Sequence, residues 1–131
     1  METIILNSIR EVSDSLGSTY KENIYQNALY TELNTRGLLC QTEVIVPVLY
    51  KAVTVGYERA DIVVYDSDRY SDKISCILEL KSQATNLGIK EIQQLRKYLN
   101  NLNCDFGILI NFNNLEVMKV TKETSQKISY G

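Results

Sequence analysis

Hydrophobic positions at helical spacing mark three segments of the chain. The first segment ends at Gly17, a residue common just after a helix, and its apolar residues are Ile5, Ile9, Val12 and Leu16. The second begins near Lys21, is followed by Gly37, and has the apolar residues Ile24, Tyr25, Ala28, Leu29 and Leu33. The third spans Ile89 to Asn101, with the apolar residues Ile92, Leu95, Leu99 and Leu102. The pattern predicts three amphipathic helices.

Between the second and third helical segments, the pattern changes to the alternation that is typical of strands. Residues Cys40 to Val55 are rich in β-branched residues at alternate positions, and Pro47 among them indicates an edge or bulged strand. Tyr57 to Tyr65 and Ile74 to Lys81 predict two more strands. The polar sequence DSDRYSDK between them, residues 66–73, predicts a hairpin loop.

The C-terminal part of the chain predicts a last pair of strands. FGILINF, residues 106–112, and LEVMKV, residues 115–120, flank Asn113-Asn114, which favours a two-residue hairpin turn. The predicted order is therefore ααβββαββ. A helix between the third and fourth strands requires a crossover, so at least one strand pair is parallel. We expect an α/β fold in which helices flank a central mixed sheet.

Length, histidine content and charge narrow the classes of protein. A chain of 131 residues can bury one hydrophobic core and is too short for two, so residues 1–131 are predicted to form a single domain. The chain has no histidine, which excludes Ser-His-Asp and Cys-His catalysis and histidine-based zinc sites. The net charge of −2 gives no overall attraction to a polyanion, so any nucleic-acid contact has to be local.

Cysteine content and hydropathy bear on the surroundings of the protein. Cys40, Cys76 and Cys104 are odd in number, widely spaced and set among apolar neighbours, which predicts buried free thiols and a reducing compartment. No apolar run approaches the roughly 18 residues needed to cross a bilayer. Glu2 stands where a signal peptide carries basic residues. We expect a cytoplasmic protein without a membrane partner.

The sequence ILELKSQ, residues 77–83, places an acid and a base in a strand that is otherwise apolar. Because side chains alternate along a strand, Glu79 and Lys81 share one face with Ile77. On the preceding strand, the same rule groups Arg59, Asp61, Val63 and Tyr65. If the two strands pair, a carboxylate from each can converge. Burying both carboxylates is costly unless a metal ion, a proton or a basic partner compensates.

Two interpretations of these charged residues stay open. A salt bridge from Lys81 to either acid at an exposed strand end would explain an isolated E-x-K triplet. The order in the chain is more specific: Asp61, then 17 residues that contain the predicted hairpin loop, then Glu79-Leu80-Lys81. This order resembles the PD-(D/E)XK nuclease superfamily.

The resemblance extends from about Leu16 to Val120 in one branch of the superfamily, the small family named for its GxxExxR motif. The opening LG-x-G-x-x-E-x-x-Y of that branch is similar to LGSTYKENIY, which aligns Leu16, Gly17, Glu22 and Tyr25. Its R-x-D is similar to Arg59-Ala60-Asp61 and its E-L-K to Glu79-Leu80-Lys81. Its Q-x-x-x-Y-L and G-x-L-I-N-F are similar to the segments 94–99 and 107–112. Five motifs in the same order argue against coincidence.

The resemblance implies a restriction-endonuclease-like fold and hydrolysis of phosphodiester bonds, most often in DNA, with Mg²⁺ or Mn²⁺. It implies that Asp61, Glu79 and the main-chain carbonyl of Leu80 hold the ion, since hard oxygen ligands suit these metals. Lys81 would orient the attacking water or stabilise the transition state. Nucleic acid, with DNA favoured, is therefore the expected partner.

Three further residues have an implied role and an ordinary alternative. The resemblance implies that Glu22 holds a second ion or a metal-bound water, and its helical spacing predicts that it faces the sheet. A first-turn glutamate that complements the helix dipole is the alternative. Gln94 and Tyr98, four residues apart on the third predicted helix, would contact the phosphate or brace Lys81. A surface hydrogen-bond pair is the alternative for them.

The basic residues and the overall function also leave alternatives. Four cations either line a groove near the site or belong to a solvated helix face: Lys51, Lys90, Arg96 and Lys97. The main alternative function is a catalytically silent nuclease-fold module that binds nucleic acid or a protein partner. A Schiff-base enzyme using Lys81 ranks lower, because the chain has no phosphate-binding glycine loop. A homodimer is expected if two copies are needed to grip a duplex.

Overall fold

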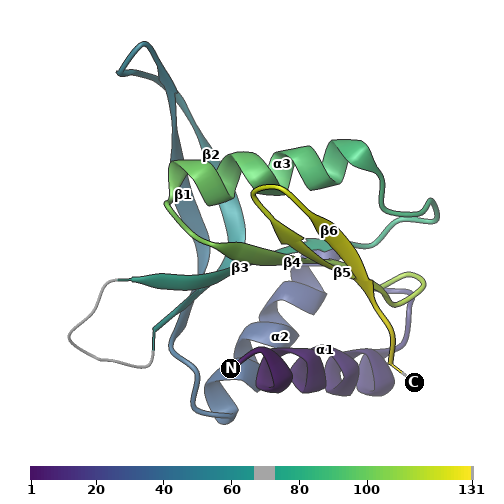
Figure 1. Ribbon diagram of the computed structural model, residues 1–131. Helices are drawn as coiled ribbons and strands as arrows, with labels where there is room; N and C mark the ends of the chain where they lie inside the picture. The colour runs from purple at the N-terminus through teal and green to yellow at the C-terminus, as the bar shows by residue number, and fades with distance from the viewer. Residues whose placement is uncertain (67–72, 131) are drawn as a thin grey trace.

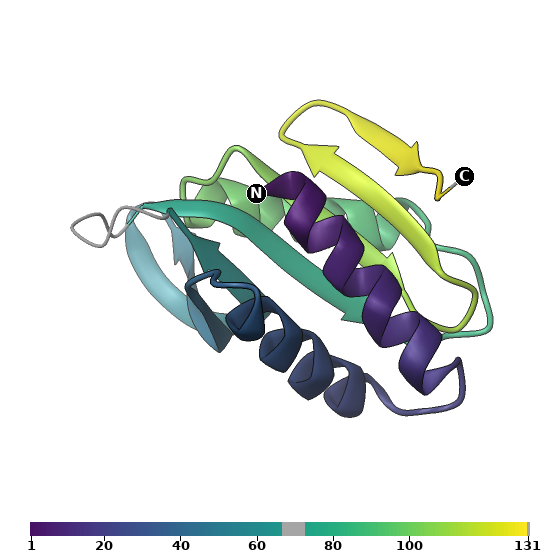
Figure 2. The same ribbon diagram turned by 90° about the horizontal axis from the view of Figure 1, so that it is seen from below.

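The computed structural model has a six-stranded sheet between two helical layers and describes residues 1–66 and 73–130 (Figure 1). The elements are α1 (Glu2–Leu16), α2 (Glu22–Thr35), β1 (Cys40–Tyr50), β2 (Val53–Tyr65), β3 (Ile74–Lys81), α3 (Ile89–Asn101), β4 (Phe106–Asn111), β5 (Glu116–Thr121) and β6 (Ser125–Ile128). Seen from below, α1 and α2 lie side by side across one face of the sheet (Figure 2). Helix α3 covers the other face.

The strands follow one another in the sheet in chain order, from β1 to β6. The β3–β4 pair is parallel and every other described pair is antiparallel. Helix α3 makes the crossover between β3 and β4, and this confirms the predicted parallel pair. The prediction of a mixed α/β sheet flanked by helices is confirmed, and the arrangement is consistent with a restriction-endonuclease-like fold.

Strand β3 lies at the centre of the core because both of its faces are covered. Leu78 and Leu80 pack in the cluster under α1 and α2, where Ile9 and Leu29 contribute from the helices. Ile77 packs in the opposite cluster, against α3. A strand covered on both faces is expected to be apolar throughout. The charged residues Glu79 and Lys81 in its C-terminal half are therefore unusual for such a strand.

The first hairpin turns earlier than the alternation predicts. Strand β1 ends at Tyr50 and β2 begins at Val53, so the prediction of one strand from 40 to 55 is wrong. Lys51 and Ala52 form the turn with φ angles of 48° and 65°. Two consecutive positive φ angles are typical of a type I′ turn, which usually carries Asn or Gly, and neither stands here. The prediction for Pro47 holds, because β1 is an edge strand with a bulge after Val48.

The C-terminal region also differs from the predicted order. Residues 112–115 form a longer turn with a φ of 50° at Leu115, and not a two-residue turn at Asn113-Asn114. A sixth strand, β6, follows and makes the order ααβββαβββ. The sequence SQKI of β6 is polar and mostly exposed, so it carries no hydrophobic alternation that could have predicted a strand.

Strands β2 and β3, the three cysteines and the three helices agree with the predictions made for them. The β2–β3 pair is antiparallel, and the Asp66 N–H donates to the Lys73 carbonyl at 2.9 Å. Residues 67–72 of the predicted hairpin loop lie outside the described residues. The three cysteines are buried and free, as predicted. None of the three helices in the described part of the chain has the length and hydrophobicity to cross a membrane.

Candidate active site

Strands β2 and β3 stop pairing where their acidic residues stand. The last Cα partners in this direction are Ile62 and Leu78. At the next position the side chains replace the backbone ladder. The Asp61 N–H donates to Glu79 Oε1 at 2.8 Å, and the Leu80 N–H donates to Asp61 Oδ2 at 2.8 Å. Each carboxylate therefore binds the backbone of the opposite strand, and the two acids converge as the strand pairing predicts.

The facing of β2 changes at Asp61. Ala60 and Val63 both pack in the cluster against α3, which strict alternation does not allow. Opposite Asp61, Glu43 has a φ of 52° and interrupts the β1–β2 pairing. The prediction that Arg59 shares the face of Asp61 and Val63 is therefore wrong, and its exposed side chain lies 4.0 Å from that of Glu43.

Glu79 and Asp61 sit in surroundings that disfavour negative charge. Only 4% of Glu79 is exposed. Burial, and then the nearby charge of Asp61, raise the pKa of Glu79 to about 8. Burial also raises the pKa of Asp61, although the hydrogen bond from the Leu80 N–H acts in the opposite direction. The two carboxylates form a site that gains from any bound cation or proton.

Lys81, the third residue of the predicted site, forms no salt bridge with Asp61 or Glu79. Within the described residues, no ion pair of 4.0 Å or less includes Lys81. Its positive charge nevertheless lowers the pKa of both Asp61 and Glu79 relative to burial alone. The main chain of Lys81 is fixed, because its carbonyl accepts a hydrogen bond from the Phe112 N–H at 2.9 Å. The ammonium group thus stays near the acids and unpaired with them, which contradicts the salt-bridge interpretation.

Glu22 lies near Asp61 and Glu79 but belongs to α2, in the helical layer formed by α1 and α2. It occupies the first turn of α2, and its charge raises the pKa of both Asp61 and Glu79. Its side chain is exposed and therefore not packed in the core, although its charge acts on the two acids of the sheet. In residues 1–66 and 73–130, no three carboxylates or thiols lie close enough to hold one ion together. Asp61 and Glu79 are thus the adjacent acids, and Glu22 is their neighbour.

Tyr25 explains how the chain places Glu22. Its hydroxyl donates to the Gly17 carbonyl at 2.6 Å and accepts from the Tyr20 N–H at 3.2 Å. Its buried ring stacks on Phe112 at a centroid distance of 4.4 Å. Tyr25 therefore fixes the α1–α2 connection to the sheet. The sequence pattern identified Tyr25 as apolar core and did not indicate this polar role.

Gln94 and Tyr98 form the predicted pair on α3, and a third residue joins them. Gln94 Nε2 donates to the Tyr98 hydroxyl at 3.1 Å, and that hydroxyl donates to Glu58 Oε2 on β2 at 3.2 Å. Burial, and then the charges of Glu79 and Glu58, raise the pKa of Tyr98 well above its ordinary value. The chain of hydrogen bonds connects α3 to β2 next to the acids. Sequence reasoning missed Glu58, whose strand position became meaningful only with the packing of α3.

A buried amide fixes the segment that follows Lys81. Asn111 is fully buried on β4, and its Nδ2 donates to the carbonyls of Gln83 and Thr85 at 3.0 and 3.1 Å. Its Oδ1 accepts from the Gln83 N–H at 3.1 Å. Asn111 therefore pairs with the backbone as another strand residue would. Its place inside the apolar run FGILINF was the one sequence signal for this role.

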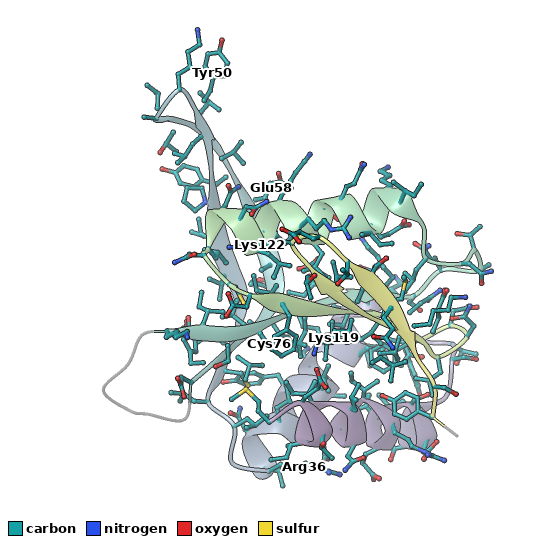
Figure 3. All side chains as sticks on the ribbon, in the orientation of Figure 1. Arg36, Tyr50, Glu58, Cys76, Lys119 and Lys122 are labelled. Carbon is teal, nitrogen blue, oxygen red and sulfur yellow. The ribbon has the colours of Figure 1, made fainter. Side chains whose placement is uncertain are left out.

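The four candidate cations do not line one common groove. Arg96 Nε donates to the Thr121 carbonyl at 3.0 Å, so it supports the sheet. Lys51 follows Tyr50, which Figure 3 labels at the end of the β1–β2 hairpin, and its Nζ lies 5.5 Å from the ring centre of Tyr50. Lys90 and Lys97 remain, and they line a small cavity on α3 beside Glu58.

The whole-chain comparison agrees with this local geometry. The family model of the PD-(D/E)XK nuclease superfamily matches residues 1–124 of the 131. The chain belongs to the PD-(D/E)XK nuclease superfamily. The matched region of this PD-(D/E)XK protein includes every predicted site residue and ends before β6. No curated protein matches the chain. Its place in the GxxExxR branch stays a prediction.

Proposed function

We propose that this PD-(D/E)XK protein is a nuclease that uses Mg²⁺ or Mn²⁺ to hydrolyse phosphodiester bonds in DNA. One observation carries the proposal: the Glu79 carboxylate accepts from the Asp61 N–H and the Asp61 carboxylate from the Leu80 N–H, in surroundings that raise both pKa values. Adjacent buried carboxylates are costly without a cation. Membership of a nuclease superfamily supports hydrolysis as the reaction.

The donor set suits a hard divalent cation. Carboxylate and carbonyl oxygens are the preferred ligands of Mg²⁺ and Mn²⁺, and Asp61, Glu79 and the Leu80 carbonyl would supply them. Glu22 would hold a second ion or a metal-bound water from its exposed position on α2. When bound, the ion lowers the pKa of a water and neutralises negative charge on the phosphate.

Lys81, Gln94 and Tyr98 would act on the substrate. Lys81 has no ion-pair partner within 4.0 Å in the described part of the chain, so its ammonium is available to orient a water or stabilise the pentavalent phosphate. Among the described residues, Gln94 uses one N–H for Tyr98, so its other N–H and its carbonyl oxygen are available for a phosphate or a base. The Tyr98 hydroxyl is protonated at ordinary pH, and burial raises its pKa further, so it braces Gln94 as a neutral group.

One observation favours the alternative, a catalytically silent module that binds a protein partner. The far part of the β1–β2 hairpin extends beyond the two layers (Figure 1) and exposes large apolar side chains. These side chains are Ile45, Leu49, Tyr50, Val53, Val55 and Tyr57. Exposed apolar groups that cluster in this way are typical of interaction surfaces. Such a surface is also compatible with an active nuclease that forms a homodimer.

A cleavage panel tests the proposed function. The purified protein would be incubated with plasmid, linear duplex DNA, single-stranded DNA and RNA, in Mg²⁺, in Mn²⁺ or in EDTA. We expect cleavage of at least one DNA substrate with either metal and none in EDTA. Absence of cleavage on all four substrates with both metals would favour the silent module, and cleavage in EDTA would exclude the proposed metal chemistry.

A further inference from the structure

A cavity of about 200 Å³ lies between β2 and the exposed side of α3. Its lining residues are Glu58, Lys90, Gln93, Gln94 and Lys97. The four α3 residues follow at intervals of three, one and three positions, so they share one helical face. At about 30 Å³ each, roughly seven water molecules fill this volume, so it has room for a single heterocyclic base.

The cavity adjoins the acidic pair. Glu58 precedes Asp61 by three residues on β2, which is about 10 Å along a strand. Tyr98 connects the two places, because its hydroxyl contacts Glu58 while the charge of Glu79 raises its pKa. A nucleic acid cleaved at Asp61 and Glu79 would therefore bring a neighbouring nucleotide to the cavity.

Glu58 gives the cavity an unusual character for a nucleic-acid surface. Its Oε2 accepts from Tyr98, and among the described residues no other group donates to this carboxylate. Neither Lys90 nor Lys97 pairs with it within 4.0 Å. A carboxylate repels phosphate and carbonyl oxygens and accepts from N–H groups. The acid is thus suited to an amino group of a base, and the lysines to the flanking phosphates.

We propose that this cavity is a base-recognition pocket in which Glu58 accepts a hydrogen bond from an exocyclic amino group. Cytosine, adenine and guanine carry such an amino group next to a ring nitrogen, whereas thymine presents carbonyl oxygens instead. Lys90 and Lys97 would contact the phosphates on either side of that base. The inference rests on the proposed function for its place in catalysis, and it makes the nuclease selective for the base beside the cleaved bond.

Binding of short labelled oligonucleotides tests the pocket without requiring cleavage. Fluorescence anisotropy would be measured in EDTA with homopolymers of deoxycytidine, deoxyadenosine and thymidine. We expect the wild-type chain to bind the cytidine or the adenosine homopolymer at least about fivefold more tightly than the thymidine one. The two amino-bearing homopolymers show which base is preferred. Equal binding of all three would overturn the proposal.

Glu58→Gln is the decisive variant, because an amide keeps the shape and reverses the preference. The Gln carbonyl can still accept from Tyr98, which turns its NH₂ group toward the cavity and toward the thymine oxygen. We expect the preference to fall below about twofold or to reverse. Glu11→Gln, an exposed acid on α1 on the far side of the sheet, changes the net charge equally and should keep it. An unchanged preference in Glu58→Gln would also overturn the proposal.

Cleavage of a randomised DNA library separates this inference from the proposed function. If the wild-type chain cleaves DNA, the sequenced ends should be depleted in thymine at one fixed position, and Glu58→Gln should lose that depletion. Cleavage without any such position would reject the pocket and leave the nuclease standing. A preference in anisotropy without cleavage would reject the nuclease and leave the pocket standing.

Discussion

Replacing Lys81 by methionine should slow Mg²⁺-dependent DNA cleavage by about a hundredfold to a thousandfold while the protein still binds the metal. The variant should fold normally, because the Lys81 side chain makes no ion pair within 4.0 Å in the described residues. Methionine keeps its aliphatic part and removes only the ammonium. Single-turnover cleavage rates and Mn²⁺ affinity by calorimetry would be measured on the same preparation.

Two variants serve as comparisons for Lys81→Met: one removes a proposed metal ligand and the other removes a charge elsewhere. Asp61→Asn can still accept the Leu80 N–H, so it should fold, but it should lose both metal affinity and cleavage. Lys122→Met removes a charge from the exposed β5–β6 turn and should change neither property. If Lys81→Met cleaved DNA at the wild-type rate, the proposed role of the lysine would be wrong. If Asp61→Asn retained full metal affinity, the proposed ligand set would be wrong.

Without metal, the free energy of unfolding should fall as the pH rises from about 4.5 to about 8. Glu79 has an ordinary pKa of 4.5, which the folded chain raises to about 8. Between these values the folded state binds more protons than the unfolded state, so raising the pH destabilises it, and the loss is complete above the folded pKa. One pKa unit corresponds to about 1.4 kcal/mol, so the total loss is on the order of a few kcal/mol.

Glu79→Gln should remove most of this pH dependence. The amide is neutral at every pH in the interval, and its carbonyl can still accept from the Asp61 N–H. Urea unfolding at several pH values in EDTA would show a flatter profile and a more stable variant at pH 8. Mg²⁺ at a hundred times its Kd should add about 2.7 kcal/mol to the wild-type chain and almost nothing to the variant. Equal slopes for the two proteins would contradict the assignment of the shift to Glu79.

The elements that sequence predicted well are those in which hydrophobic spacing alone decides the structure. Helix α3 and strand β3 have the predicted limits, since their apolar residues pack directly on the core. The antiparallel pairing of β2 with β3, which brings Asp61 near Glu79, was also predictable, but the change of facing at Asp61 was not. The resemblance to the nuclease superfamily then gave these two acids a chemical interpretation.

The features that sequence missed depend on tertiary contacts. The Lys51-Ala52 turn lacks the residues that usually mark positive φ angles, so only the completed hairpin reveals it. Strand β6 is held by pairing with β5 and has no apolar face of its own. Glu58 and Asn111 acquire their roles from α3 and from the segment after Lys81, which lie far away in the sequence. Local periodicity carries no information about such partners.

A crystal structure with Mn²⁺ would test the central claim, that Asp61 and Glu79 form the divalent-cation site. Anomalous scattering locates the ion independently of any assumption about its ligands. We expect one strong peak within about 2.1 to 2.3 Å of carboxylate oxygens from both residues and of the Leu80 carbonyl. No peak between Asp61 and Glu79, at a Mn²⁺ concentration that supports cleavage, would contradict the proposed site.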